Sequence, residues 1–275
     1  GQLWETAADR VKAMGGDIRM NCSVKEIITE NGRVTAVKYV KDGEEITLDG
    51  DIIISSMPVK DLINGIKDAP DDIVRVAEGL PYRDFMTVGI LCDKLELKNK
   101  TKMKTLGDIV PDCWIYVQDT GMKMGRIQVF NNWSPYLVEK PDSTVWMGLE
   151  YFCREGDEYW TMDDKAFADM AADELVKMGV IRSSEAVKDF HVERVKKAYP
   201  AYFDTYDEMD KVISYADSFG NLYCVGRNGQ HRYNNMDHSM MTAFEAIDNI
   251  LSGKQTKENV WNVNTEKEYH EQKSN

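Results

Sequence analysis

The chain has 275 residues, of which 43% are hydrophobic, 10% aromatic and 29% charged, and its formal net charge is −13 at pH 7. This length and composition indicate a globular protein with one large domain or two ordinary ones, and they argue against a disordered or fibrous chain. The acidic balance argues against nucleic-acid binding, because a phosphate backbone requires a surplus of Lys and Arg.

Membrane and disulfide-rich proteins are also disfavoured. No apolar run approaches the roughly 18 residues that a membrane helix requires, and no signal peptide is visible. The cysteines are odd in number, widely spaced and without a CxxC pair, which argues against a disulfide framework and a structural zinc site. They are Cys22, Cys92, Cys113, Cys153 and Cys224. We therefore expect a cytoplasmic protein.

The first 65 residues predict one helix followed by short strands. Spaced apolar residues favour a helix over residues 3–14, which Gly15 and Gly16 end. Strands are expected over residues 23–29, 34–40, 45–48 and 51–55. Asn-Gly and Asp-Gly pairs between them are typical of hairpin turns, and the apolar run at 51–55 is typical of a strand covered on both faces.

The middle of the chain predicts an antiparallel sheet with a long helix. After a short helix over residues 71–80, the aromatic-rich strands form a meander. They are expected over residues 84–92, 113–118, 125–133 and 144–153. A helix over 163–178, a strand over 187–195 that ends before Tyr199-Pro200, and a helix over 206–216 follow. We expect five aromatic side chains on the inner face of this sheet: Trp114, Tyr116, Trp133, Trp146 and Tyr151.

The end of the chain predicts a strand, a polar loop and a helix. The strand covers residues 221–226, the loop 227–236 and the helix 237–251, with a cap from Asp237 or Ser239 and a stop at Gly253. Residues 254–275 are expected to form a polar tail with Trp261 as its anchor, solvated at 266–271. The predicted fold class is α/β, or α+β overall: the two ends share one α/β region, and the middle is an inserted sheet-plus-helix domain.

The junction of this last strand and helix is the segment that best suits a ligand. Gly226 would permit close approach to the backbone, and the following helix start offers unpaired N–H groups to an anionic or electron-rich group. An ordinary strand–loop–helix connection explains the same pattern equally well.

This segment resembles the C-terminal flavin-contacting motif of the FAD-dependent amine-oxidase superfamily, which includes protoporphyrinogen-oxidase-like proteins and UDP-galactopyranose mutases. The residues that carry the resemblance are Gly226-Arg227 followed by His231-Arg232-Tyr233-Asn234-Asn235-Met236-Asp237, closest to the mutase branch. The first 65 residues are similar to the family independently, in the order helix, Gly-Gly, VxxI strand, NGRV hairpin and DIIIS strand.

The resemblance implies an FAD-binding region made from residues 1–65 and 216–253, around a substrate-binding domain at 66–215. One departure is important: the GxGxxG fingerprint that holds the FAD pyrophosphate in this family is absent. The chain also opens on Gly-Gln-Leu-Trp, already in the predicted helix. We therefore expect a fragment of a flavoenzyme, itself inactive, in which self-association would cover apolar surface left open.

The resemblance also implies the site residues. FAD would contact Val24, Gly226, Arg227, Met236 and Asp237, and the substrate would contact Arg232, Tyr199, Tyr202 and Tyr233. Simpler alternatives remain for several: sheet core for Val24, an ion pair for Arg232, and aromatic core for Tyr199 and Tyr202. No metal site is expected, although His231, Asp237 and His238 lie in one loop. No catalytic side chain is assigned, because the flavin would carry the chemistry.

Three hypotheses follow. The first is a mutase-like flavoenzyme that acts on a nucleotide sugar in cell-surface polysaccharide synthesis. The second is an FAD-dependent oxidoreductase of the amine-oxidase or protoporphyrinogen-oxidase type. The third is a non-catalytic module that kept the architecture and lost the cofactor, with the missing glycine fingerprint as its support.

Overall fold

The computed structural model describes residues 1–264 and divides into two compact units. Unit 1 contains residues 1–81 and the chain from Pro200 onward, and unit 2 contains residues 82–199. The inserted unit thus lies within the expected range 66–215, and it is narrower because the helices on either side of it pack into the core of unit 1. The expected solvated segment 266–271 lies outside the described residues.

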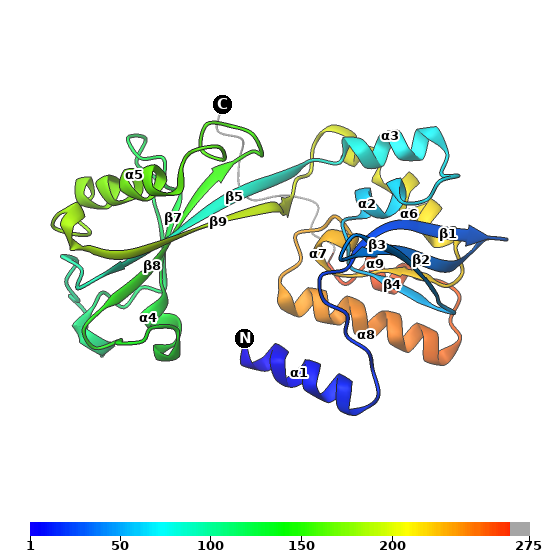
Figure 1. Cartoon of the computed structure of the whole chain (residues 1–275), viewed down its shortest axis with the longest axis horizontal. Coiled ribbons are helices and arrows are strands. Elements are labelled where there is room, and N and C mark those ends of the chain that lie inside the picture. Colours follow the sequence, from blue (N-terminus) through cyan, green and yellow to red (C-terminus); the bar gives the residue numbers. More distant parts are fainter. Residues whose placement is uncertain (265–275) are drawn as a thin grey trace. The chain divides into compact units, whose positions relative to one another are not determined.

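Unit 1 is built from both chain ends (Figure 1). Its first stretch contains α1 (Gln2–Ala13), β1 (Ser23–Glu30), β2 (Arg33–Lys41), β3 (Glu44–Asp49), β4 (Ile53–Ser55), α2 (Val59–Asn64) and α3 (Asp71–Gly79). Its second stretch contains α6 (Met209–Ser218), β10 (Leu222–Cys224), α7 (Gly226–Gly229), α8 (Met236–Ser252) and α9 (Glu258–Trp261). The predicted hairpins are confirmed, since β1, β2 and β3 pair antiparallel in that order.

The second sheet of unit 1 joins the two chain ends directly. β4 and β10 pair in parallel, with Ile53 opposite Leu222. The buried Asn221 side chain fastens this pair to the antiparallel sheet: its Oδ1 accepts from Val34 N–H at 2.9 Å, and its Nδ2 donates to Val34 O at 2.7 Å and to Asp51 O at 2.9 Å. One buried amide therefore holds three segments of unit 1 in register.

Helix α8 has apolar residues on two of its faces. One face packs on the unit through Ala246, which is fully buried, and Ile250. A second stripe, spaced as one face of a helix, stays exposed: Met236, Met240, Phe244, Ile247 and Leu251. We call these five residues the α8 stripe. Parallel sheets and their helices are normally covered on both sides, so unit 1 has the appearance of one part of a larger layer.

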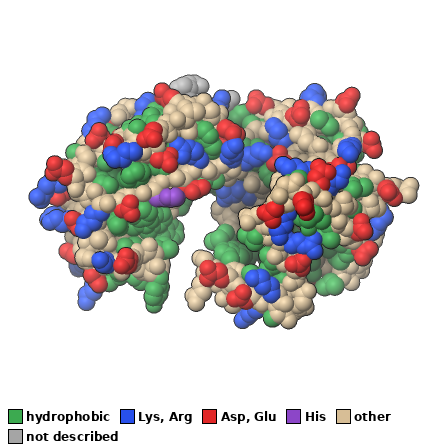
Figure 2. Space-filling view, viewed as in Figure 1, with side chains coloured by type: hydrophobic (Ala, Val, Ile, Leu, Met, Phe, Trp, Pro, Cys, Tyr) green, Lys and Arg blue, Asp and Glu red, His purple; other side chains and the backbone are tan. Residues whose placement is uncertain are grey.

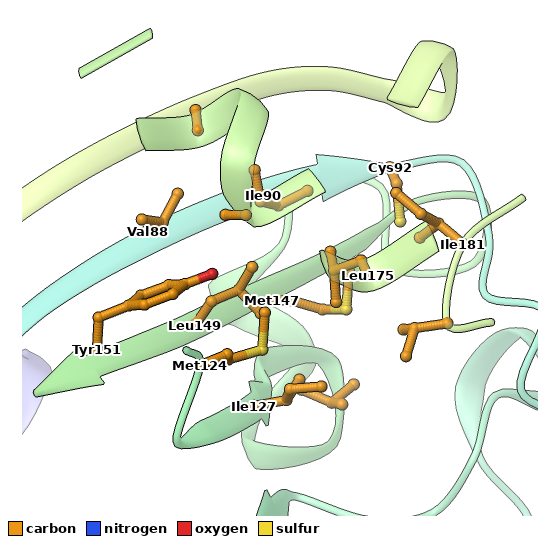
Figure 3. Packing of buried hydrophobic residues seen from close by; sticks show 14 of the residues in the cluster. Val88, Ile90, Cys92, Met124, Ile127, Met147, Leu149, Tyr151, Leu175 and Ile181 are labelled. Atoms are coloured by element: carbon orange, nitrogen blue, oxygen red, sulfur yellow. The ribbon is translucent and has the colours of Figure 1, made fainter. Parts of the chain in front are cut away.

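Unit 2 is a five-stranded sheet with one helix over its core face (Figure 1). Its elements are β5 (Tyr82–Cys92), β6 (Trp114–Tyr116), β7 (Arg126–Val129), α4 (Phe130–Trp133), β8 (Val145–Cys153), α5 (Asp164–Lys177) and β9 (Val187–Pro200). Strand alternation turns one side chain in two toward α5, as Figure 3 shows for Val88 and Ile90 on β5 and for Met147, Leu149 and Tyr151 on β8. The result is one contiguous core.

Four details of unit 2 differ from the sequence prediction. The strand order is β6-β7-β8-β5-β9, so the sheet is not a simple meander. Residues 130–133 form helix α4, where a strand was predicted. β9 continues to Pro200 because a proline at a strand end removes no needed ladder bond. Of the five aromatic residues expected in the core, only Tyr151 lies there. Trp114 and Tyr116 are exposed because Ile115 takes the core-facing position of β6, Trp133 is exposed on α4, and Trp146 is half-buried beside Gly89.

None of the described helices combines the length and the apolar character needed to cross a bilayer. The described cysteines are unpaired thiols.

Candidate functional site

The candidate site lies in unit 1, where β10 ends and α8 begins. Val225 N–H donates to Ser55 O at 2.9 Å, which extends the parallel pairing one residue past β10. Gly226 then takes φ +75°, a backbone conformation that suits glycine, and its N–H donates to Thr242 Oγ1 of α8 at 2.9 Å. The chain can therefore leave the strand and turn at once into the single helical turn α7.

A second glycine holds the loop against the strand end. A Cβ atom at Gly229 would lie 2.7 Å from the backbone oxygen of Ser55. Only glycine fits there without a shift of the backbone, so the loop after β10 and the end of β4 form one close-packed surface.

Aromatic and cationic side chains gather beside this turn. Arg227 Nε donates to Asn234 O at 2.8 Å, and its guanidinium carbon lies 4.9 Å from the centre of the Tyr233 ring. Tyr233 N–H donates to the Tyr202 hydroxyl at 2.5 Å, and Tyr202 stacks on Tyr206 with ring centres 4.5 Å apart. Two segments about 30 residues apart in sequence are thereby held together, with Arg227 over one ring.

Several buried polar atoms in the loop lack a hydrogen-bond partner within the part of the chain that the structure describes. They are Asn228 Oδ1, Arg232 Nη1 and Asn234 Oδ1, together with Ser55 Oγ at the end of β4. Asn234 is almost fully buried, and its Nδ2 donates to Gln230 Oε1 at 3.2 Å, so its orientation is fixed. An unsatisfied buried polar group costs about 1–3 kcal/mol. Such a concentration is typical of a place where a ligand or water completes the bonding.

A cavity of about 480 Å³ opens at this junction. Its walls come from α1, the end of β4, the loop after β10 and the first turns of α8: Trp4, Ser56, Val225, Gly226, Arg227, Asn234, Asn235, Met236, Ser239, Met240 and Ala243. Figure 2 shows hydrophobic side chains at the surface where α8 begins. The cavity thus combines apolar side chains with a few polar groups, which is typical of a small-molecule site.

The start of α8 corrects one prediction. The N-cap is Asn235, not Asp237 or Ser239: the Asn235 side chain accepts from the N–H of His238, and His238 Nδ1 accepts from Asn235 N–H at 3.4 Å. Asn235 has an extended backbone, whereas Asp237 is already helical, so the earlier residue is the one that can cap. Asp237 lies on the wall of a separate cavity of about 490 Å³ with His238.

The predicted site residues are distributed over both units. Gly226, Arg227 and Met236 line the first cavity together. Arg232, Tyr202 and Tyr233 lie in or against the adjoining loop, where Arg232 N–H donates to Arg227 O at 3.0 Å. Val24 lies on β1 opposite Tyr39, and it lines neither this cavity nor that of Asp237.

Tyr199 belongs to unit 2, where it meets residues that the sequence did not single out. Its hydroxyl accepts from Arg126 at 2.9 Å, and Arg126 Nη2 lies 2.5 Å from Glu150 Oε2. Burial disfavours the charge on Arg126, but Glu150 and Tyr199 hold its pKa above the ordinary value. No motif marks this pair: the two residues lie 24 positions apart, and only the β7–β8 register places them opposite each other.

His231 is fully buried beside the loop. Its Nε2 lies 3.1 Å from the backbone oxygen of Ala201. Burial lowers the pKa of His231 to about 4, so the ring is neutral at pH 7. Among the described residues, no three side chains are arranged to hold a metal ion.

Solved structures show what this architecture is similar to. A reduced UDP-galactopyranose mutase superposes with a TM-score of 0.68 at 19% identity, over 91% of this chain and 51% of that one. The chain has the fold of part of that protein. Two other solved structures also match. A putative protoporphyrinogen oxidase from Exiguobacterium superposes with a TM-score of 0.58 at 14% identity, over 82% of this chain and 46% of that one. A fatty acid isomerase from P. acnes superposes with a TM-score of 0.52 at 13% identity, over 88% of this chain and 49% of that one.

These matches confirm the predicted fold class and, at the level of fold, the predicted resemblance. The chain spans about half the length of each of these proteins. No family model matches the sequence.

Proposed function

We propose that this chain is a fragment of an FAD-dependent enzyme that acts on a nucleotide sugar, and that it contributes part of the flavin site. The observation that carries the proposal is the convergence of the resembling motif on one cavity: Gly226, Arg227 and Met236 lie in its wall at the start of α8. The flavin, when bound, supplies the redox or nucleophilic chemistry, and the chain supplies placement.

The residues of the cavity fit one end of this cofactor. A planar ring system can lie against the apolar side chains, and the buried, unpartnered Asn234 Oδ1 is an acceptor for a ring N–H. Arg227, fixed by Asn234 O and the Tyr233 ring, is the cation for an electron-rich group of the cofactor or the substrate. The sequence has no glycine-rich cradle for the pyrophosphate, which another segment must supply.

The α8 stripe also supports a site that this chain shares with another segment. Five large apolar side chains along one helix face exceed what a finished surface normally exposes. An upstream α/β segment that pairs beside β4 would cover the stripe and complete the parallel sheet. This is consistent with the chain spanning 51% of the mutase it resembles in fold.

The experiment is an FAD absorbance titration on this chain and on the same chain extended upstream to its natural start. We expect stoichiometric yellow FAD in the extended protein, and its loss in Arg227→Ala but not in Arg75→Ala, which removes an exposed ion pair with Glu208. UDP-galactose should then perturb the flavin spectrum. Absence of flavin binding by both proteins would overturn the proposal.

A second candidate has one observation in its favour. The putative protoporphyrinogen oxidase also shares the fold, at a TM-score of 0.58. If the flavin binds but no nucleotide sugar perturbs it, an FAD-dependent oxidation becomes the better proposal, and screening moves to apolar and amine substrates.

A further inference from the structure

The loop between β5 and β6 concentrates lysine in a chain that is acidic as a whole. Every second residue from 98 to 104 is a lysine: Lys98, Lys100, Lys102 and Lys104. No Asp or Glu occurs between Glu96 and Asp108, whereas the whole chain has a net charge of −13. We call residues 98–106 the lysine loop.

The side chains between the lysines fold this loop on itself. Asn99 Oδ1 accepts from Thr101 N–H at 2.9 Å and from Thr101 Oγ1 at 2.8 Å. Asn99 Nδ2 donates to Met103 O at 2.7 Å, and Met103 N–H donates to Thr101 Oγ1 at 3.1 Å. Because Asn99 and Thr101 bond the backbone of the loop, its shape is fixed without use of the lysines.

Two contacts anchor the base of the lysine loop to unit 2. Lys98 and Ile109 form an antiparallel bridge, and Thr105 Oγ1 donates to Ile109 O at 2.6 Å. Ile109 is 6% exposed and belongs to the core of the unit. Both ends of the loop are thus held on the core, so a partner does not have to order it, and the entropy cost of binding is lower.

The four lysines are available to an external anion. All four are exposed, and none forms an ion pair within the part of the chain that the structure describes. Glu96, which precedes the loop, is held by Arg182 at 3.3 Å. Even with Asp108 included, residues 97–108 have four lysines against one acid. Salt at 0.15 M screens charges beyond about 8 Å, so distant acidic residues do little to oppose this local charge.

Exposed apolar side chains lie among the lysines. Met103 is 65% exposed and Leu106 is 42% exposed. An anionic lipid surface accepts both kinds of side chain, because cations meet the headgroups and apolar groups reach the acyl boundary. A nucleic acid would use the cations alone, since bases stack on aromatic or Arg side chains and the lysine loop has neither.

We propose that the lysine loop docks this chain on an anionic membrane surface, with its four lysines among the lipid headgroups and Met103 at the boundary with the acyl chains. Each lysine at such a surface strengthens binding about fivefold. A single loop of this size gives reversible, salt-sensitive binding and no insertion across the bilayer. The loop belongs to unit 2, and its docking does not depend on whether the chain binds FAD.

The test is co-sedimentation of the full chain with vesicles of phosphatidylcholine alone, or of phosphatidylcholine and phosphatidylglycerol in equal parts. We expect clear binding to the mixed vesicles, weakened as the salt concentration rises from about 0.05 to about 0.5 M, and little binding to the neutral ones. The α8 stripe is apolar and would bind both kinds of vesicle. The difference between the two vesicles therefore isolates the contribution of charge.

Three variants locate the contact. Lys100→Gln combined with Lys102→Gln should weaken binding to the mixed vesicles about twentyfold. The matched control, Lys12→Gln combined with Lys25→Gln, removes the same charge from two exposed lysines of unit 1 and should change binding less than about twofold. Met103→Ser keeps every charge and should weaken binding several-fold. Circular dichroism reports whether each variant is folded.

The proposal is overturned if neutral vesicles bind the chain equally well, if the control pair weakens binding as much as the loop pair, or if Met103→Ser has no effect. A DNA duplex offers phosphate charge without an acyl boundary, so it should displace the chain from mixed vesicles only in large excess of phosphate over lipid. Displacement at equal phosphate concentration would contradict a membrane partner and favour a nucleic acid.

Discussion

The two units differ in how completely each covers its own apolar surface. Unit 2 comes from one continuous stretch, and its helix α5 closes over a core in which Phe167 and Leu149 are fully buried. Unit 1 comes from both chain ends, and it leaves the α8 stripe exposed beside a parallel sheet of two short strands. The difference is that unit 2 covers its own apolar core, whereas unit 1 leaves an apolar helix face uncovered.

Two phenylalanines on helices offer the largest test of this contrast. Phe167 on α5 is fully buried and lies 4.9 Å from the Tyr151 ring, whereas Phe244 on α8 is 58% exposed. Phe167→Ala should lower the free energy of unfolding of unit 2 by about 3–5 kcal/mol, because it leaves a cavity in the core. Phe244→Ala should change the stability of unit 1 by no more than about 0.5 kcal/mol. Urea unfolding measures both, and equal losses would contradict the contrast.

The next effect is a pH dependence of the stability of unit 1, caused by His231. Burial lowers the pKa of His231 to about 4, from the ordinary value of 6.5. The unfolded chain therefore binds a proton more readily, so the stability of unit 1 should fall as the pH drops from about 6.5 to 4, by up to about 3 kcal/mol. Above pH 6.5 this contribution is fully present. Unfolding curves at a series of pH values measure the slope.

The control for that slope is His231→Gln, which cannot titrate. The variant should be less stable at pH 7, since it replaces a buried ring next to Ala201, but its stability should vary less between pH 6.5 and 4. An unchanged slope would mean that carboxylates, and not His231, cause the pH dependence.

Local signals in the sequence predicted much of the fold. Asp163, for example, precedes the predicted helix, and its side chain accepts from the N–H groups of Lys165 and Ala166 as an N-cap should. The Asn-Gly hairpin and the end of the helix at Gly253 were also predicted from neighbouring residues alone. Gly253 ends the helix because it takes a left-handed φ of +69°. Such features need only the neighbouring residues.

Features that depend on register or on distant burial could not be predicted. The sequence showed that residues 113–118 alternate, but it did not show that Ile115 and not Trp114 faces α5. Arg126 and Glu150 meet only because two strands align, and His231 is buried among distant residues such as Ala201 and Tyr206. For the candidate site, the motif located Gly226, Arg227 and Met236, whereas Asn234 lay within the motif but received no role until its burial was seen.

A substitution in the α8 stripe should change the stability least, but it should clearly change the self-association of the chain. Without an upstream segment to cover it, the stripe should bring copies of this chain together, because burying apolar area at an interface is favourable. Phe244→Lys places a charge in the middle of the stripe and should shift the chain toward monomer, with a change in unfolding free energy within about 0.5 kcal/mol. Sedimentation equilibrium at several protein concentrations measures the association.

The matched control for this variant is Tyr136→Lys, which adds the same charge to a fully exposed aromatic position of unit 2. If both variants weaken association equally, the added charge and not the stripe is responsible. If only Phe244→Lys does so, the exposed face of unit 1 is the one that requires a partner. Extension of the chain upstream should then abolish self-association without any substitution, because the added segment and the second copy compete for the same apolar surface.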